Sequence, residues 1–308
     1  MMKKFLCGAL AAAMVAGTVV AAAPASDASA ASVPKAKYTF NMNKKSKNVV
    51  AVARKKDTAN YTTSNTETGT LPSASNAKKV KLKYAKGKHG KALYLDRSSS
   101  YGAQLKNVKL GSGSWTLSFW VKPVNNLSSF MSVFFTGNHI TDPKNTKWIS
   151  ITRGGDDWPA AGSTPLIWSH SLTKGKNEQF PWYSYQNKDG EWMGVKDDAK
   201  AAGIKANTWS YVTLVVNTKK TSWDKNGYCE YGTKGEDGYV KGYHGWTYVN
   251  GSLFGNGAIA KGTMTNSNLF FLGINAWDAP FKGYYDDVQL WNKALAPKQV
   301  KALYKKMK

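Results

Sequence analysis

The chain has 308 residues, of which 43 are lysine or arginine and 19 are aspartate or glutamate, so its formal net charge is +24. Such a charge favours polyanionic surroundings through a field that salt screens. Cys7 lies in a leader segment, which leaves Cys229 without a partner. The sequence therefore excludes an internal disulfide, and a packed core must supply the stability.

The first 30 residues have the pattern of a cleaved export signal. Two lysines precede an apolar run over 5–23, and an Ala-Ser-Ala sequence at 28–30 offers a cleavage site. We therefore predict a signal peptide over 1–30 and a secreted mature chain, extracellular or associated with the cell wall. For an exported chain, nucleic acid is not the expected partner. No other segment has the roughly 18 apolar residues that a membrane span needs, so no span is predicted.

Positive charge is concentrated near the start of the mature chain. Residues 35–91 hold fifteen lysines or arginines against only Asp57 and Glu67, and the last eleven residues add five lysines. Such runs are usually solvated surface. The alternative is a surface that binds an anionic polymer.

Alternation of apolar and polar residues predicts β-strands in the middle of the chain. The first of them has a large apolar residue at every second position from Trp115, and the next is apolar and β-branched on both faces. Asn250-Gly251 between β-rich flanks is a strong hairpin signal. The predicted strands are 114–122, 209–216, 247–254, 269–272 and 284–291.

One helix is predicted, at the C-terminus. Pro297 suits a first helical turn, and Val300, Leu303 and Tyr304 then share one face. Ala296 is a weak N-cap, so the helix must be held by packing. This order of elements predicts an all-β fold, a two-sheet antiparallel β-sandwich with a short C-terminal helix.

Five sequence blocks support this fold class. They are GKHGKALYLDRSSSYGAQL (87–105), WTLSFWVKP (115–123), NTWSYVTLVVN (207–217), TYVNGSLFG (247–255) and FKGYYDDVQLWNKALAPKQVKALY (281–304). In this order they resemble the bacterial laminin-G-like jelly roll of the concanavalin A-like lectin/glucanase superfamily. The resemblance implies one jelly-roll domain over 31–308, with the first and last strands side by side. The two lysine-rich regions should then lie on one side of the molecule.

The last predicted strand carries two adjacent acids, Asp286 and Asp287. Strict alternation sends them to opposite sheet faces, and an unpaired charge next to the core is costly. In similar jelly rolls an aspartate here helps to hold a structural calcium ion, so the resemblance implies calcium at Asp287. The early acid expected for such a site is replaced by Asn41. The alternative is a carboxylate that only accepts hydrogen bonds.

Segment 142–200 is rich in tryptophan and tyrosine among Gly, Pro, Asn, Ser and Asp, outside the predicted strands. Aromatic planes pack on the C–H faces of sugars while amides and carboxylates fix the hydroxyls, so this composition predicts glycan-binding loops. The alternative is that the rings roof a second small core. With one residue from a later loop, the predicted glycan-binding residues are Trp158, Trp168, Trp182, Tyr183, Tyr185, Trp192 and Trp277.

No catalytic residues are predicted. Retaining glycanases need two carboxyl groups about 5 to 5.5 Å apart, and the Glu-x-Asp-x-x-Glu pattern of related enzymes is absent. Glu178, Asp189 and Glu191 remain possible for an inverting pair. We therefore predict a non-catalytic, lectin-like module for polysaccharide or an anionic cell-surface polymer. The alternatives are a cryptic glycoside hydrolase or polysaccharide lyase, and a protein-binding adhesion module.

Overall fold

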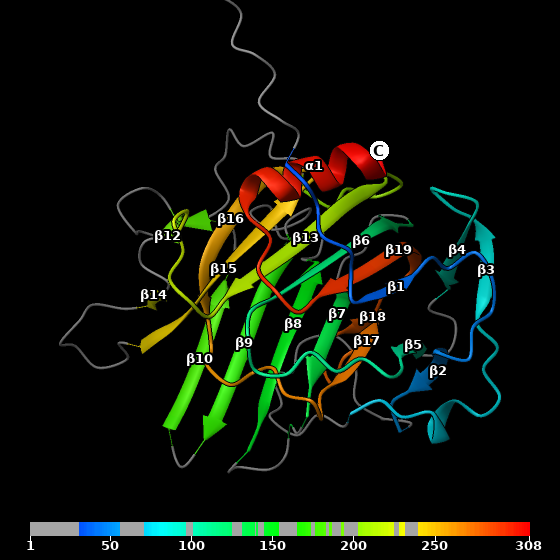
Figure 1. Ribbon diagram of the computed structural model, residues 1–308. Coiled ribbons are helices and arrows are strands. Elements are labelled where there is room, and N and C mark those ends of the chain that lie inside the picture. The colour runs from blue at the N-terminus through cyan, green and yellow to red at the C-terminus, as the bar shows by residue number, and fades with distance from the viewer. Residues whose placement is uncertain are drawn as a thin grey trace, which may run out of the picture. The chain divides into compact units, whose positions relative to one another are not determined.

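Two antiparallel β-sheets packed face to face, with one helix at the C-terminal end, form the unit Ser32–Lys308 of this computed structural model (Figure 1). The structure describes residues 31–55, 71–96, 101–124, 131–138, 140, 145–153, 165–173, 176–182, 185–186, 192–193, 203–224, 228–231 and 240–308. Of these, only the backbone is described for 165–166, 168, 172–173, 176–182, 185–186, 192–193, 228–231 and 240. The predicted signal peptide lies outside the described residues.

The nine-stranded sheet contains both the first and the last strand of the fold. Its strands are β1 (Tyr38–Phe40), β3 (Lys83–Lys86), β4 (Lys91–Leu95), β6 (Trp115–Pro123), β13 (Ser210–Asn217), β14 (Tyr228–Tyr231), β15 (Val240–Val249), β16 (Ser252–Ile259) and β19 (Gly283–Trp291). Their order is β14-β15-β13-β6-β19-β4-β3, with β16 on β15 and β1 on β19. Thr39 lies opposite Gln289, so the first and last strands are neighbours, as the resemblance implied.

The second sheet has eight strands. They are β2 (Val49–Ala53), β5 (Tyr101–Leu105), β7 (Met131–Gly137), β8 (Lys147–Arg153), β9 (Pro165–Thr173), β10 (Lys176–Trp182), β17 (Leu269–Leu272) and β18 (Ala279–Pro280). Their order is β10-β9-β8-β7-β17-β5-β2, and only β18 pairs in parallel, with β7. A separate pair joins β11 (Tyr185–Gln186) to β12 (Trp192–Met193). The predicted fold class is confirmed.

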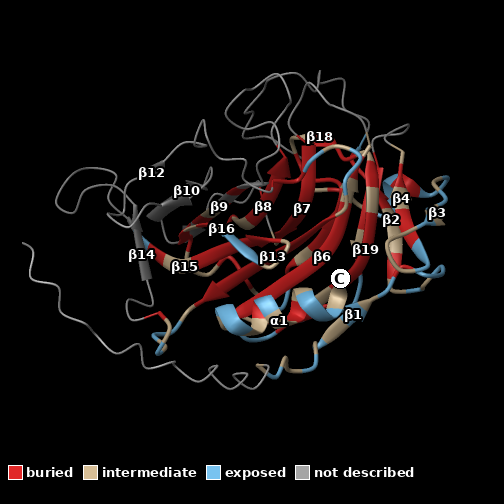
Figure 2. Cartoon of the chain, turned by 90° about the horizontal axis from the view of Figure 1, so that it is seen from above, coloured by how far each residue is buried: buried red, intermediate tan, exposed pale blue. Residues whose placement is uncertain are grey.

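The core lies between the two sheets and follows from the period of two. On β6, Leu117, Phe119 and Val121 point inward and are fully buried. Phe134 and Phe270 face them from the eight-stranded sheet. Figure 2 shows the central strands as almost continuously buried. Each such side chain contributes roughly 1.5–3 kcal/mol through burial.

The predicted C-terminal helix is α1 (Pro297–Met307). Val300 and Leu303 are buried against the outer face of the nine-stranded sheet. Ala296 makes no side-chain cap, and the Gln299 side chain instead accepts a 2.9 Å hydrogen bond from the Ala296 N–H. Packing therefore holds this helix, as the weak cap predicted.

Segment 142–200 contains strands of the eight-stranded sheet, so the prediction that it consists of loops is wrong. In β8, Ile149 and Ile151 face the core and alternate with Trp148, Ser150 and Thr152. Only two apolar residues of β8 point inward, and Ser150 and Thr152 on the outer side are polar. The composition of this segment therefore did not indicate a strand. Sheet pairing on both sides fixes β8 in place.

A β-bulge interrupts β19 at its two acids. The register against β6 shifts between Asp286 and Gln289, and Asp287 has a φ of 45°. Tyr285 and Val288, on either side of the acids, both face the core. The bulge inserts one residue and leaves both acids on the outer side. The prediction that they point to opposite faces is therefore wrong.

Both acids reach one turn of the β3–β4 hairpin. Asp286 Oδ2 accepts 3.0 Å hydrogen bonds from the Lys88 and His89 N–H groups, and its Oδ1 accepts one from Asp287 N. Asp287 Oδ2 lies 2.6 Å from His89 Nδ1. Calcium would have to replace these donors, and the described residues contain no group of three or more His, Cys, Asp or Glu suited to a metal. Calcium at Asp287 stays a prediction.

Candidate glycan-binding face

The outer face of the eight-stranded sheet carries an aromatic cluster. Inner side chains such as Phe134 and Phe270 belong to the core between the sheets. The next residues along the same strands, Phe135 and Phe271, lie in a separate cluster with Trp148 of β8. The strand period of two therefore puts one ring of each pair on each face.

The cluster has a buried floor and an accessible top. Phe135 is fully buried, and its ring centroid lies 6.4 Å from that of Trp148 and 5.8 Å from that of Trp277. Trp148 and Trp277 are 4.8 Å apart, and His170 stacks on Trp148 at 5.8 Å. Trp148, Trp277 and His170 are each half-buried. These three rings form the aromatic face, which offers partly exposed edges and planes at fixed positions.

A buried polar network fixes the loop that presents Trp277. Asn275 Oδ1 accepts hydrogen bonds from the backbone N–H groups of Trp277 (2.9 Å) and Asp278 (2.7 Å). Asp278 Oδ2 in turn accepts bonds from Asn275 Nδ2 (2.6 Å) and Thr152 Oγ1 (2.8 Å). Burial raises the pKa of Asp278, although these bonds and Arg54 oppose the shift. The network ties the loop to β8, so the indole is held before any ligand arrives.

Asp278→Asn is expected to flatten the pH dependence of stability. Because the pKa of Asp278 is raised above 3.8, the folded state holds this proton more tightly than the unfolded state. Its share of stability is complete below the unfolded pKa and is lost as pH rises through the folded pKa. Asparagine does not titrate, and its oxygen can accept both bonds. Urea unfolding of both proteins from about pH 4 to about pH 7 measures the change; parallel curves would contradict it.

The predicted glycan-binding residues have different outcomes. Trp277 lies in the aromatic face. The Cα of Trp168, on β9, lies opposite Ser150 of β8, which is two residues along the strand from Trp148. The Trp168 side chain is not described. The other backbones on strands, without described side chains, are those of Trp182 (β10), Tyr185 (β11) and Trp192 (β12). Trp158 and Tyr183 lie outside the described residues.

The sequence did not point to Trp148, His170 or Asn275 as members of one face. Trp148 alternates with the inward Ile149, and recognising β8 as a strand would have placed it on an outer surface. Asn275 and Trp277 come from a loop more than a hundred residues later. Only the pairing of β7 with both β8 and β17 brings these parts together.

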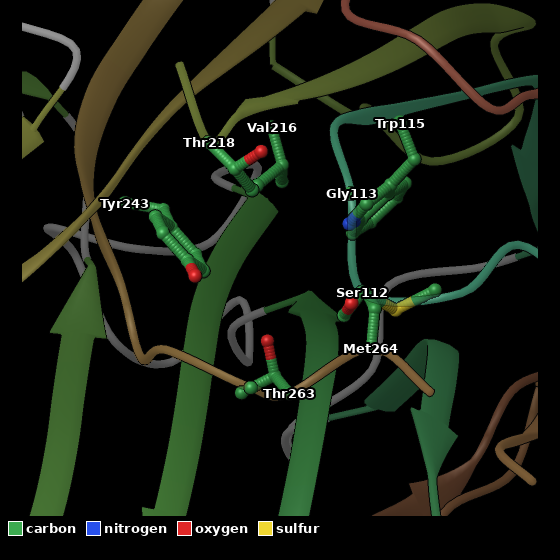
Figure 3. A pocket seen from close by; sticks show the side chains of 9 residues that line it. Ser112, Gly113, Trp115, Val216, Thr218, Tyr243, Thr263 and Met264 are labelled. Carbon is green, nitrogen blue, oxygen red and sulfur yellow. The ribbon is translucent and has the colours of Figure 1, made fainter. Parts of the chain in front are cut away.

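A small pocket lies at one end of the sandwich, near the start of β6 and the end of β13. Figure 3 shows Tyr243 on one side of it and Trp115 and Met264 on the other. Its empty volume is about 180 Å³, and ligand pockets usually have at least about 300 Å³. We assign no glycan to it.

Comparison with known proteins agrees with this architecture. Residues 239–301 match the family described as the concanavalin A-like lectin/glucanases superfamily, which confirms the resemblance in this part of the chain. No curated protein sequence matches the chain. In the described residues, no helix has the length and apolar character needed to cross a membrane.

Several solved structures are similar to the chain. One is domain 4 of AbnA, a GH43 extracellular arabinanase from Geobacillus stearothermophilus in complex with arabinotriose, at 25% identity over 73% of this chain and 82% of that one (TM-score 0.46). Another is the binding domain of Paraclostridial Mosquitocidal Protein 1, at 15% identity over 83% and 52% (TM-score 0.43). A third is a heptameric SAP-like pentraxin from Limulus polyphemus, at 14% identity over 61% and 68% (TM-score 0.34).

Proposed function

We propose that this protein is a secreted, non-catalytic carbohydrate-binding module that holds polysaccharide or an anionic cell-surface polymer. The observation that carries the proposal is the aromatic face, formed by Trp148, Trp277 and His170, next to the network of Asn275 and Asp278. Flat C–H surfaces of sugar rings pack on such rings, and the rings need no rearrangement because the network fixes their loop. A partly exposed face can accommodate an extended polymer better than a closed pocket can.

The lysine-rich regions support the anionic part of the proposal. Met307, in the last turn of α1, accepts a 4.0 Å contact from Gln289 Nε2, and Gln289 lies opposite Thr39 of β1. The basic end of α1, with Lys305 and Lys306, is therefore next to the strand that begins the basic N-terminal region. Their fields add on this side of the sandwich and attract polyanions at low salt.

Affinity electrophoresis of the mature chain in gels containing neutral or acidic polysaccharides tests the proposal. We expect slower migration in at least one neutral glycan that persists at about 300 mM salt, since stacking is not screened. A reducing-end assay with the same polymers should show no new ends. Turnover would contradict the non-catalytic assignment, and unchanged migration in every glycan would contradict carbohydrate binding.

A further inference from the structure

The outer face of the nine-stranded sheet carries a row of aromatic and basic side chains. These residues are far apart in the sequence and lie side by side on neighbouring strands. Lys83 of β3 lies opposite Tyr94 of β4, and Tyr94 lies opposite Tyr284 of β19. Tyr284 lies opposite Lys122 of β6, and the pairing of the next residues puts Trp209 beside Lys122. These five residues, from five adjacent chain segments, form what we call the cross-strand row.

The side chains of the cross-strand row contact one another. The rings of Tyr94 and Tyr284 stack with centroids 4.7 Å apart and planes at 28°. Lys122 Nζ lies 4.7 Å from the centroid of Tyr284 and 5.5 Å from that of Trp209. An ammonium group therefore sits between two rings, a cation–π arrangement that holds the charge in place.

The cross-strand row is accessible. Helix α1 covers the neighbouring residues Trp120 and Tyr211, and Trp209, at one end of the row, packs against the same cluster. The Lys83 side chain is 60% exposed, and the other four residues are half-buried. Figure 2 shows half-buried segments on β4 and β19, beyond the end of the helix.

Several polar groups of the row have no hydrogen-bond or ion-pair partner among the described residues. In the part of the chain that the structure describes, Lys122 forms no ion pair, and the phenol hydroxyls of Tyr94 and Tyr284 form no hydrogen bond. The adjacent carboxylates are engaged, Asp96 by Lys83 and Asp286 by backbone N–H groups. Unpaired donors therefore outnumber free acceptors along the row.

Two more lysines add positive charge near Lys122 and Trp209, toward one end of the row. The Lys282 carbonyl accepts a 3.0 Å hydrogen bond from Val124 N, just after β6. The Lys205 carbonyl accepts a 3.4 Å bond from Thr208 N, next to Trp209. Both backbones are thus fixed close to this part of the row.

We infer that the cross-strand row binds a linear glycan that carries repeated oxyanions, carboxylate or phosphate, at a site separate from the aromatic face. Ammonium groups, phenol hydroxyls and the positive edges of aromatic rings all favour oxyanions. Strands about 4.8 Å apart give a row about 19 Å long, which suits an extended chain more than a single ion. Purely structural cross-strand packing is the competing explanation.

Matched variants of the mature protein separate the two explanations. Lys122→Gln removes the charge that lies between Tyr284 and Trp209, and Lys91→Gln removes an exposed charge on β4 away from the row. The double variant Tyr94→Phe and Tyr284→Phe removes two hydroxyls while keeping the rings, and Tyr304→Phe is its control on α1. Calorimetry measures binding to polygalacturonate, a linear phosphorylated mannan and a neutral glucan at about 50 mM and about 300 mM salt.

Lys122→Gln and the double phenylalanine variant should each weaken binding to an acidic polymer by roughly fivefold, with little change in the two controls. The polymer that shows this loss identifies carboxylate or phosphate as the recognised group. Equal effects in variants and controls, or equal binding of neutral and acidic polymers, would overturn the inference. Loss of neutral-glycan binding in Trp277→Ala tests the proposed function alone, because Trp277 lies in the β17–β18 loop and packs on the other sheet.

Discussion

Trp277→Ala is expected to weaken binding of the neutral polysaccharide by at least about tenfold, which is typical of removing a central aromatic anchor. The indole is half-buried and contacts Trp148 and Phe135, and the Trp277 backbone N–H donates a hydrogen bond to Asn275 Oδ1. Alanine removes the stacking plane and leaves this backbone bond in place. Isothermal calorimetry with the glycan that slows migration most measures the change.

Trp223→Ala provides the control for this prediction. Trp223 is also half-buried and also packs against another indole, that of Trp246, but it lies in the β13–β14 loop and Trp246 belongs to the nine-stranded sheet. We expect it to lower stability without reducing neutral-glycan affinity. If both variants lost affinity equally, or if Trp277→Ala bound as well as the parent protein, the aromatic face would not be the binding surface.

Asp286→Ala is expected to lower the free energy of unfolding by about 3 kcal/mol or more. The carboxylate accepts three backbone N–H groups, two of them in the hairpin turn at Lys88 and His89. Alanine leaves these donors unpaired in a place where the residue is fully buried. Burial raises the pKa of Asp286 to about 6, so unfolding in urea is best followed near pH 7.5, where the group is ionised.

Two variants show whether this loss comes from the buried acceptor. Asp286→Asn keeps one acceptor oxygen and should cost less than alanine. Asp96→Ala removes the partner of the exposed Lys83 and should cost less than Asp286→Ala. If Asp286→Ala lowered the free energy of unfolding no more than Asp96→Ala does, the hydrogen bonds from the β3–β4 turn to Asp286 would not be what stabilises the fold here.

Local patterns in the sequence were sufficient for the fold class. The alternation from Trp115 to Val121, the Asn250-Gly251 turn and the apolar face of the C-terminal helix each became the element they predicted. These signals work because the side-chain period of a strand or helix is a local property of the backbone. The resemblance added the neighbouring positions of the first and last strands.

Strand register and strand order were decided by the tertiary structure. The bulge at Asp287 reverses the expected face of one acid, and the pairing of β8 places Trp148 beside Trp277. The cross-strand row likewise joins residues from Lys83 to Tyr284. The bulge, the Trp148–Trp277 contact and the cross-strand row each depend on contacts between segments far apart in the chain. These contacts form only when the sheets pack, and they produce no periodic pattern within any one segment.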